Sequence, residues 1–296
     1  MLRWGDGAGE VGLRPGATDF PAEGPSSVAV GPMGSVVVLD RINERALEIT
    51  PAGQVRVVGE VARDVEHVAV GPDGAVAGWS PLRASVWITG RGGSPLGEVA
   101  VPRELRDVVR IELGISRRVI VTTAMQETLV LGSPRLPLDL AGALRTKREG
   151  AAFLADGRAV ASRVTEGGAG EILVYRKAGK DDDAKPPVAW SFTIEAPVAA
   201  VRVVGAAGNV VCARVERVTQ AADGERELIV DREALCVEAD TGSILAQRPM
   251  GRRGLYTMHA DVAVGGNPPV LAVVKPEDDG LHLERVSLAT TTEVAR

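Results

Sequence analysis

Short runs of apolar residues alternate with turns rich in glycine, proline and aspartate along almost the whole chain. The runs at residues 27–30 and 35–39 are typical: both are rich in valine, and the turn GPMG at residues 31–34 joins them. Runs of this length, bounded by such turns, predict β-strands with tight connections. The best helix candidate, residues 137–147, is short and can equally be a loop. We therefore expect an all-β protein.

One phrase returns after 40 residues: VAVGPMG at residues 28–34 reappears as VAVGPDG at residues 68–74. A fixed period of about 20 to 50 residues is the signature of a repeat architecture. Each copy consists of a strand, a turn and a second strand, a unit too small to bury its own apolar face. The units must therefore cover one another, as the blades of a β-propeller do.

Six such units can be laid out along the chain. Their approximate boundaries are residues 25–63, 65–103, 106–147, 149–195, 197–249 and 255–296. We expect one domain over residues 1–296, a six-bladed β-propeller of four-stranded antiparallel blades, with seven blades as the alternative. A strand within residues 1–5 is expected to complete the last blade and close the ring. Two insertions, residues 177–187 and 216–232, predict a surface loop and a protruding hairpin.

Composition and charge exclude several classes of protein. The net charge is −5, from 34 basic and 39 acidic residues without a basic block, so we expect no nucleic-acid partner. No run of 18 apolar residues occurs, so we expect no membrane insertion. Residues 1–6 lack the apolar core of a signal peptide, which makes the cytoplasm the default location. A periplasmic or exported location applies if a leader has been removed.

The two cysteines, Cys212 and Cys236, each lie 12 residues from Gly224 in the predicted turn at residues 222–225. If this turn joins two paired strands, the cysteines face each other across the pair. A disulfide would then need Cα atoms within about 7 Å. Nothing else in the sequence indicates an oxidising compartment, so we favour two reduced, buried cysteines and leave their pairing open.

Three motifs follow one another in the first 60 residues: WGDGAG at residues 4–9, P-x-x-VAV-x-x-x-G-x-VVV-x-D at residues 25–40, and NERAL at residues 43–47. Together they resemble the repeats of the NHL-repeat propellers. The match is good in the first unit and partial in the second, where GWS at residues 78–80 replaces the segment that ends in Asp40; beyond residue 105 only spacing and turns persist. The resemblance implies a propeller that mostly serves as a binding platform, and in a minority of cases acts as a lyase or hydrolase.

The three histidines, His67, His259 and His282, are far apart, and no HxH, HExxH or CxxC spacing is present. His67 and His259 lie at or beside predicted inner strands, which line the channel of a propeller, so both can approach the axis. They are either polar lining or candidate binding residues. We expect no metal site, no cofactor and no catalytic nucleophile, because a G-x-S-x-G elbow is absent and the glycines at residues 5–9 open no helix.

Charged residues near turns are assigned structural roles. Asp40 ends a strand and can accept backbone N–H groups from the following turn. Turn geometry and the repeat motif also favour structural roles for further residues, namely Arg45, Asp73, Asp156 and Asp240.

The segment GRRGLY at residues 251–256 is the most interface-like, because arginine and tyrosine are enriched where proteins meet. Arg252, Arg253 and Tyr256 therefore join His67 and His259 as candidate binding residues. Our main hypothesis is a non-catalytic scaffold or accessory subunit of a larger bacterial assembly, which binds an unidentified protein partner with one rim of the ring. The alternative is a hydrolase or lyase of NHL or lactonase type at the channel mouth, with or without a metal, which would use Asp40, His67 or His259.

Overall fold

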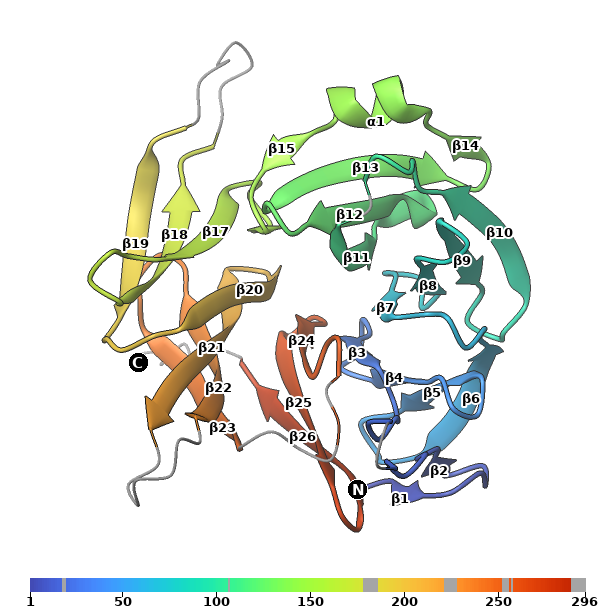
Figure 1. The fold of residues 1–296 in the computed structure, drawn as a ribbon. Coiled ribbons are helices and arrows are strands. Elements are labelled where there is room, and N and C mark those ends of the chain that lie inside the picture. The colour runs from blue at the N-terminus through green and yellow to red at the C-terminus, as the bar shows by residue number, and fades with distance from the viewer. Residues whose placement is uncertain are drawn as a thin grey trace, which may run out of the picture.

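The computed structural model describes residues 1–17, 20–105, 107–177, 186–220, 228–251, 256 and 258–288. Six β-sheets stand round one central axis, so the chain is a six-bladed β-propeller (Figure 1). This confirms the predicted fold class. Each blade runs from an inner strand at the axis to an outer strand at the rim, and neighbouring strands within a blade are antiparallel.

The first two blades follow the repeated phrase. The first consists of β3 (Ser27–Val30), β4 (Val36–Asp40), β5 (Arg45–Ile49) and β6 (Val55–Glu60), and the second of β7 (His67–Val70), β8 (Val76–Ser80), β9 (Ser85–Thr89) and β10 (Pro95–Ala100). Their registers are equivalent, since Val28 pairs with Val38 in the first blade and Val68 with Gly78 in the second.

The third and fourth blades depart most from the repeat. The third contains β11 (Val108–Leu113), a 3-10 turn (Ile115–Arg117), β12 (Val119–Thr123), β13 (Glu127–Ser133), β14 (Leu136–Pro137), helix α1 (Leu140–Arg145) and β15 (Arg148–Glu149); the fourth contains β16 (Ala152–Phe153), β17 (Ala159–Val164), β18 (Gly170–Tyr175) and β19 (Val188–Ile194). The outer strand β14 of the third blade is only two residues long. Helix α1 begins after this strand. Asp139 caps its N-terminus, because the Asp139 carboxylate accepts a hydrogen bond from the Gly142 N–H at 2.7 Å.

The fifth and sixth blades complete the ring. They comprise β20 (Ala200–Ala207), β21 (Val210–Gln220), β22 (Leu228–Glu238) and β23 (Ile244–Gly251), followed by β24 (Val262–Gly265), β25 (Val270–Glu277) and β26 (Gly280–Ser287). The expected hairpin at residues 216–232 is present as the paired ends of β21 and β22, but its turn lies outside the described residues. Most of the expected loop at residues 177–187 also lies outside them.

The N-terminus closes the ring, as predicted. Leu2 pairs with Leu281 through two backbone hydrogen bonds of 2.9 and 2.8 Å, which adds the missing outer strand beside β26. The chain then forms the short parallel pair β1 (Arg3–Trp4) and β2 (Glu10–Val11) and passes to the first blade.

Each blade buries its neighbours because successive side chains of a strand point to opposite faces. In β4, Val36 and Val38 pack toward the sixth blade, whereas Val37 and Leu39 pack toward the second. Both faces are therefore apolar, which explains why these strands do not alternate between apolar and polar residues. No helix of the described residues is long and apolar enough to cross a membrane.

Cys212 and Cys236 form a disulfide, with their Cα atoms 4.1 Å apart. The expectation that they face each other across a strand pair is confirmed by the register of β21 and β22. The preference for two reduced cysteines was wrong. It rested on the absence of other signs of an oxidising compartment, whereas the directly opposed positions bring the two side chains close enough for their Sγ atoms to bond.

Candidate functional site

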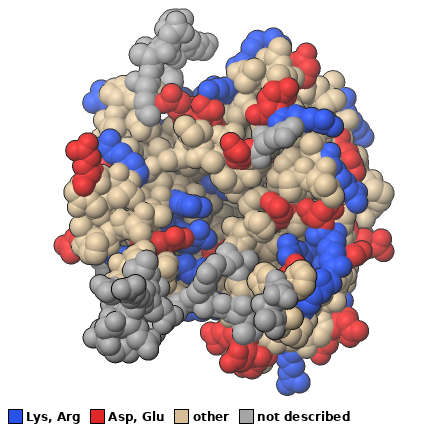
Figure 2. All heavy atoms as spheres, in the orientation of Figure 1, with Lys and Arg blue, Asp and Glu red and all other residues tan. Residues whose placement is uncertain are grey.

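A cavity of about 1010 Å³ occupies the central channel. It is lined by the inner strands of five blades and by Thr122 and Thr123 of β12. In the fourth blade, whose inner strand β16 has only two residues, Ala151 and residues 162–164 of β17 line it instead. Basic and acidic side chains gather in the hollow at the centre of the face shown in Figure 2. The channel therefore combines an apolar wall with a few charged groups.

One group of polar side chains on this wall comes from two blades. The rings of His67, at the start of β7, and His259, just before β24, meet edge to face with 5.6 Å between their centroids. Glu66 lies beside them, with its Oε2 4.0 Å from Nδ1 of His259. One ligand atom from each of these three residues lies within 4.8 Å of the other two. We call Glu66, His67 and His259 the channel triad.

The first blade holds this triad together, because its inner strand lies between the two blades that supply it. The carbonyl of Ser26 accepts the backbone N–H of His259 at 2.8 Å, and the Ser27 hydroxyl accepts the N–H of Val68 at 3.2 Å. One main-chain bond and one bond to the Ser27 hydroxyl thus fix the backbone on both sides. The two histidines, distant in sequence, become neighbours because the ring closes.

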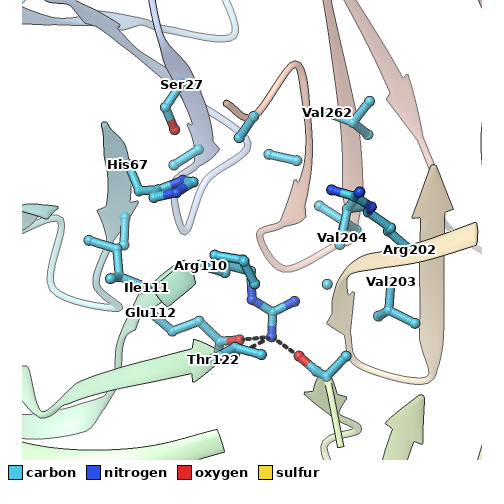
Figure 3. A pocket seen from close by; sticks show the side chains of 18 of the residues that line it. Ser27, His67, Arg110, Ile111, Glu112, Thr122, Arg202, Val203, Val204 and Val262 are labelled. Atoms are coloured by element: carbon cyan, nitrogen blue, oxygen red, sulfur yellow. Dashed lines mark hydrogen bonds and ion pairs between the residues drawn. The ribbon is translucent and has the colours of Figure 1, made fainter. Parts of the chain in front are cut away.

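His67 is buried, at 7% exposure, and its ring points into the cavity (Figure 3). Burial lowers the pKa of His67 to about 4, with a further contribution from His259. The imidazole is therefore neutral at pH 7. No side-chain hydrogen bond to this ring occurs within the described residues, so its nitrogen atoms can serve a ligand.

Arginine side chains form another part of the wall. Arg110 on β11 and Arg202 on β20 both point into the cavity (Figure 3). Deeper in the fifth blade, Arg214 and Arg232 bind the buried carboxylate of Asp261 at 3.2 and 2.8 Å. Asp261 is thus neutralised by two cations, while Arg202 forms no ion pair with any described residue.

The structural residues proposed from the sequence hold turns and blades. Asp40 is fully buried and accepts hydrogen bonds from Gly12 N at 3.0 Å, from Asn43 and from Arg45 Nε at 3.2 Å. Arg45 donates to the carbonyls of Gly7 and Glu10, both at 2.8 Å. Asp40 therefore ties the N-terminal segment to the first blade and does not line the cavity, so its inclusion among the candidate catalytic residues was wrong.

The other three aspartates make comparable contacts at turns. Asp73 accepts the N–H of Ala75 at 3.1 Å and pairs with Arg117 on the next blade at 2.9 Å. Arg158 binds Asp156 of its own turn at 2.6 Å and Asp240 of the fifth blade at 2.7 Å. These contacts link adjacent blades at their turns.

The segment at residues 251–256, which the sequence suggested as an interface, offers no exposed binding residue among those that the structure describes in it. Arg252 and Arg253 lie outside the described residues. Tyr256 is buried, at 8% exposure, and its ring packs edge to face with Trp4 at 6.3 Å between centroids. Its aromatic face is thus engaged in the closure of the ring and is not free on the rim.

Sequence reasoning did not single out Glu66, Arg110 or Arg202. Glu66 belongs to no recognisable motif, and only the structure shows that it lies beside His259 of another blade. Arg110 and Arg202 had a usable signal, because each is a charged residue inside a strand predicted to line the channel. A charged residue in an otherwise apolar inner strand is therefore worth noting in repeat proteins of this kind.

The comparisons with known proteins give fold-level similarity to solved structures. A streptogramin B lyase is 11% identical, with 93% of this chain and 97% of that chain covered and a TM-score of 0.46. A PQQ-bound aldose sugar dehydrogenase from Streptomyces coelicolor is 15% identical, with 92% and 97% covered and a TM-score of 0.45. A virginiamycin B lyase from Staphylococcus aureus is 13% identical, with 89% and 84% covered and a TM-score of 0.41.

No protein-family model matches the chain. No curated protein matches it either. The similarity to NHL-repeat propellers therefore stays a resemblance of motifs in the first two blades. At identities of 11–15%, the matched structures assign no activity to this chain.

Proposed function

We propose that the protein is a metal-assisted hydrolase or lyase whose site is the channel triad. The observation that carries the proposal is the convergence of three metal-ligating side chains, Glu66, His67 and His259, on the wall of a large cavity. Concave sites with an apolar lining and a few convergent polar groups are where proteins usually bind small molecules.

The ligand set suits Zn²⁺. Two histidines and one glutamate, with a fourth position open to the cavity, are a known combination in catalytic zinc sites. Ligand atoms in a tetrahedral zinc site lie about 3.4 Å apart, so the triad must contract by about 1 Å. The side chains of His259 and Glu66 are 40% and 35% exposed and can make that movement. His67 is buried and already in the neutral form that binds a metal.

Zinc bound there would lower the pKa of a coordinated water and polarise a substrate oxygen. The protein's own contribution would be positional. His67 would anchor the ion at the wall, while Glu66 and His259 would complete the ligand set from the more exposed side. Addition of a water across a substrate bond that breaks, with departure of the leaving group, would make the protein a hydrolase; loss of a substrate proton and of a leaving group from neighbouring atoms, with no water added, would make it a lyase.

The direct test is isothermal titration calorimetry, in which ZnCl₂ is added to EDTA-treated protein and the heat of binding is measured. We expect one zinc per chain in the wild type and a loss of affinity of at least about 100-fold in the His259→Ala and Glu66→Gln variants. Because both side chains are partly exposed, neither change should prevent folding, and circular dichroism checks this.

The matched control is His282→Ala. His282 belongs to a second group of possible ligands, with Glu277 and Asp279, but this group is exposed at a hairpin. The control should leave zinc stoichiometry and affinity unchanged. Zinc binding that survives His259→Ala, or that disappears only in His282→Ala, would contradict the proposal.

The scaffold hypothesis is the rival. Its support is the general use of propeller rims for binding, and the burial of Tyr256 removes one of its candidate contacts. Purification of the tagged protein from its source cells distinguishes the two. A partner recovered in equal amount, from a protein that binds no zinc, would favour the scaffold.

We further propose an oxidising location, such as the periplasm or the cell exterior, in place of the cytoplasmic default. The disulfide between Cys212 and Cys236 supports this, since such bonds are rare in reducing compartments. Alkylation of the protein immediately on lysis of its source cells should then label neither cysteine. Two labelled thiols would contradict the proposed location.

A further inference from the structure

The geometry points to an oxyanion-binding site in the channel, formed by Arg110 and Arg202, and we propose that it binds the carboxylate or phosphate of an organic anion. This inference rests on the proposed function in one respect: the anion is taken to be the substrate of the channel triad. Its evidence is separate, because it comes from other residues on other strands.

Arg110 is positioned through one nitrogen of its guanidinium, Nη2. Its Nη2 pairs with Glu112 at 2.5 Å and also donates to the carbonyl of Ala151 in the fourth blade. Its Nε and Nη1 are buried and form no hydrogen bond within the described part of the chain. Figure 3 shows the guanidinium at the wall of the cavity, with Nη2 directed to these partners. The N–H groups of Nη1 are donors of the kind that pair with a carboxylate or phosphate oxygen, and a small turn of the side chain toward the cavity would present them to a ligand.

The unpartnered donors are significant because leaving a buried charged group without hydrogen bonds costs free energy. Proteins rarely keep such groups without a function. Gly205 lies beside Arg110: a Cβ atom built there would be in ordinary contact with Nη1, at 3.8 Å, and would crowd only Val264, at 2.9 Å. The backbone of the fifth blade thus approaches the guanidinium without a competing acceptor side chain.

Arg202 supplies the second cation. It is exposed to the cavity and lies opposite Arg214 of the neighbouring strand β21. Arg214 itself forms ion pairs with Asp261 and Glu216. Because Asp261 and Glu216 are paired with other arginines, Arg202 remains available to pair with an anionic ligand. Arg110 and Arg202 project from the third and fifth blades into the same cavity (Figure 3).

The remaining wall indicates what carries the anionic group. Apolar side chains of the inner strands surround the two arginines, including Ile111, Val203, Val204 and Val262. A free inorganic ion would leave this surface unused. We therefore infer a ligand with an anionic group attached to an apolar body, so that burial of the body and pairing of the charge act together.

The test uses three probes on EDTA-treated protein at low ionic strength: benzoate, inorganic phosphate and the neutral analogue benzyl alcohol. Titrations are followed by NMR chemical shifts of the protein. We expect saturable one-to-one binding of benzoate or phosphate with a Kd of about 1 mM or lower, and at least tenfold weaker binding of benzyl alcohol. Tighter benzoate binding indicates a carboxylate substrate, and tighter phosphate binding a phosphate ester.

Arg202→Gln should weaken binding of the preferred anion at least tenfold. Arg110→Gln should do the same, but it also removes the bond to Ala151, so the Arg202 variant decides if the Arg110 variant does not fold. The control is Arg163→Gln, because Arg163 also lines the cavity but is 62% exposed and paired with Glu171. It should change binding less than twofold. Equal binding by wild type and Arg202→Gln, or no saturation by either anion below about 10 mM, would overturn the proposal.

The two proposals fail separately. Anion binding is measured without metal, and zinc binding is measured without anion. Loss of zinc binding with retained anion binding rejects the metal-assisted enzyme and keeps the oxyanion site. The reverse result keeps the metal site and rejects an anionic substrate.

Discussion

The imidazole of His67 lies edge to face against that of His259, 5.6 Å away between centroids, although the two residues belong to the second and sixth blades. The first blade lies between these two blades and binds both of them, through Ser26 and Ser27. Two imidazole rings are thereby held together at the wall of the channel. The buried ring of His67 is neutral at pH 7.

A pH dependence of stability follows from the buried ring. The pKa of His67 is lowered from 6.5 to about 4 in the folded protein, mainly by burial and further by His259. Between these values the unfolded chain takes up a proton that the native protein does not. The stability present above pH 6.5 should therefore decline as the pH falls toward 4, by up to about 3 kcal/mol.

Urea unfolding of EDTA-treated protein at pH 7.5 and pH 4.5 measures this loss. The same measurement on His67→Gln corrects for all other titrating groups, which both proteins share. The wild type should lose more stability than the variant over this interval. An equal loss in both proteins would show that His67 is not the responsible group.

The Asp40 network should be essential to ring closure. Asp40→Ala leaves Arg45, whose side chain is 13% exposed, without its carboxylate and frees the Gly12 N–H. Removal of one partner from a buried pair costs about 3–5 kcal/mol. We expect this loss in urea unfolding, together with faster proteolysis within residues 5–12.

Asp73→Ala is the matched control, because it also removes a turn aspartate paired with an arginine, but the Asp73 side chain is 47% exposed. An exposed pair of this kind contributes about 1 kcal/mol or less. If the two variants lose similar stability, the Asp40 network does not have the proposed role.

The sequence was sufficient for the fold because the repeat, the turns and the apolar inner strands are local signals. The closing role of the N-terminus also followed, since an open ring would expose apolar faces. The site was harder to predict. His67 and His259 could each be placed near the axis, but their contact depends on ring closure, and Glu66 has no distinguishing neighbours in the sequence. The facing positions of Cys212 and Cys236 followed from the strand register, whereas the expectation of reduced thiols relied on the compartment and was wrong.

The disulfide should contribute to stability through the unfolded state. It closes a loop with a sequence separation of 24 residues, for which chain entropy gives about 3 kcal/mol. The double variant Cys212→Ala, Cys236→Ala should therefore unfold at lower urea concentration than the oxidised wild type. Reductant should destabilise the wild type by a similar amount and leave the double variant unchanged. A wild type insensitive to reductant under unfolding conditions would contradict this expectation.

One of the departures of the second blade from the repeat involves a cross-strand pair of residues that can be tested by substitution. Val38 faces Leu47 in the first blade, whereas Gly78 faces Trp87 in the second. A Cβ atom at Gly78 would lie 2.4 Å from the indole of Trp87, so the ring occupies the space that Val38 fills in the first blade. Gly78→Val should therefore destabilise the protein by about 1–3 kcal/mol through overpacking.

Trp87→Leu should also destabilise, because it removes the ring that covers the glycine. The double variant Gly78→Val, Trp87→Leu recreates the pair of the first blade, so the two changes should compensate each other. We expect urea unfolding of the four proteins to give a coupling free energy of about 0.5–3 kcal/mol in favour of the double variant. If the stability losses of the two single variants simply add up in the double variant, Gly78 and Trp87 are not energetically coupled. The irregularity of the second blade then has another cause.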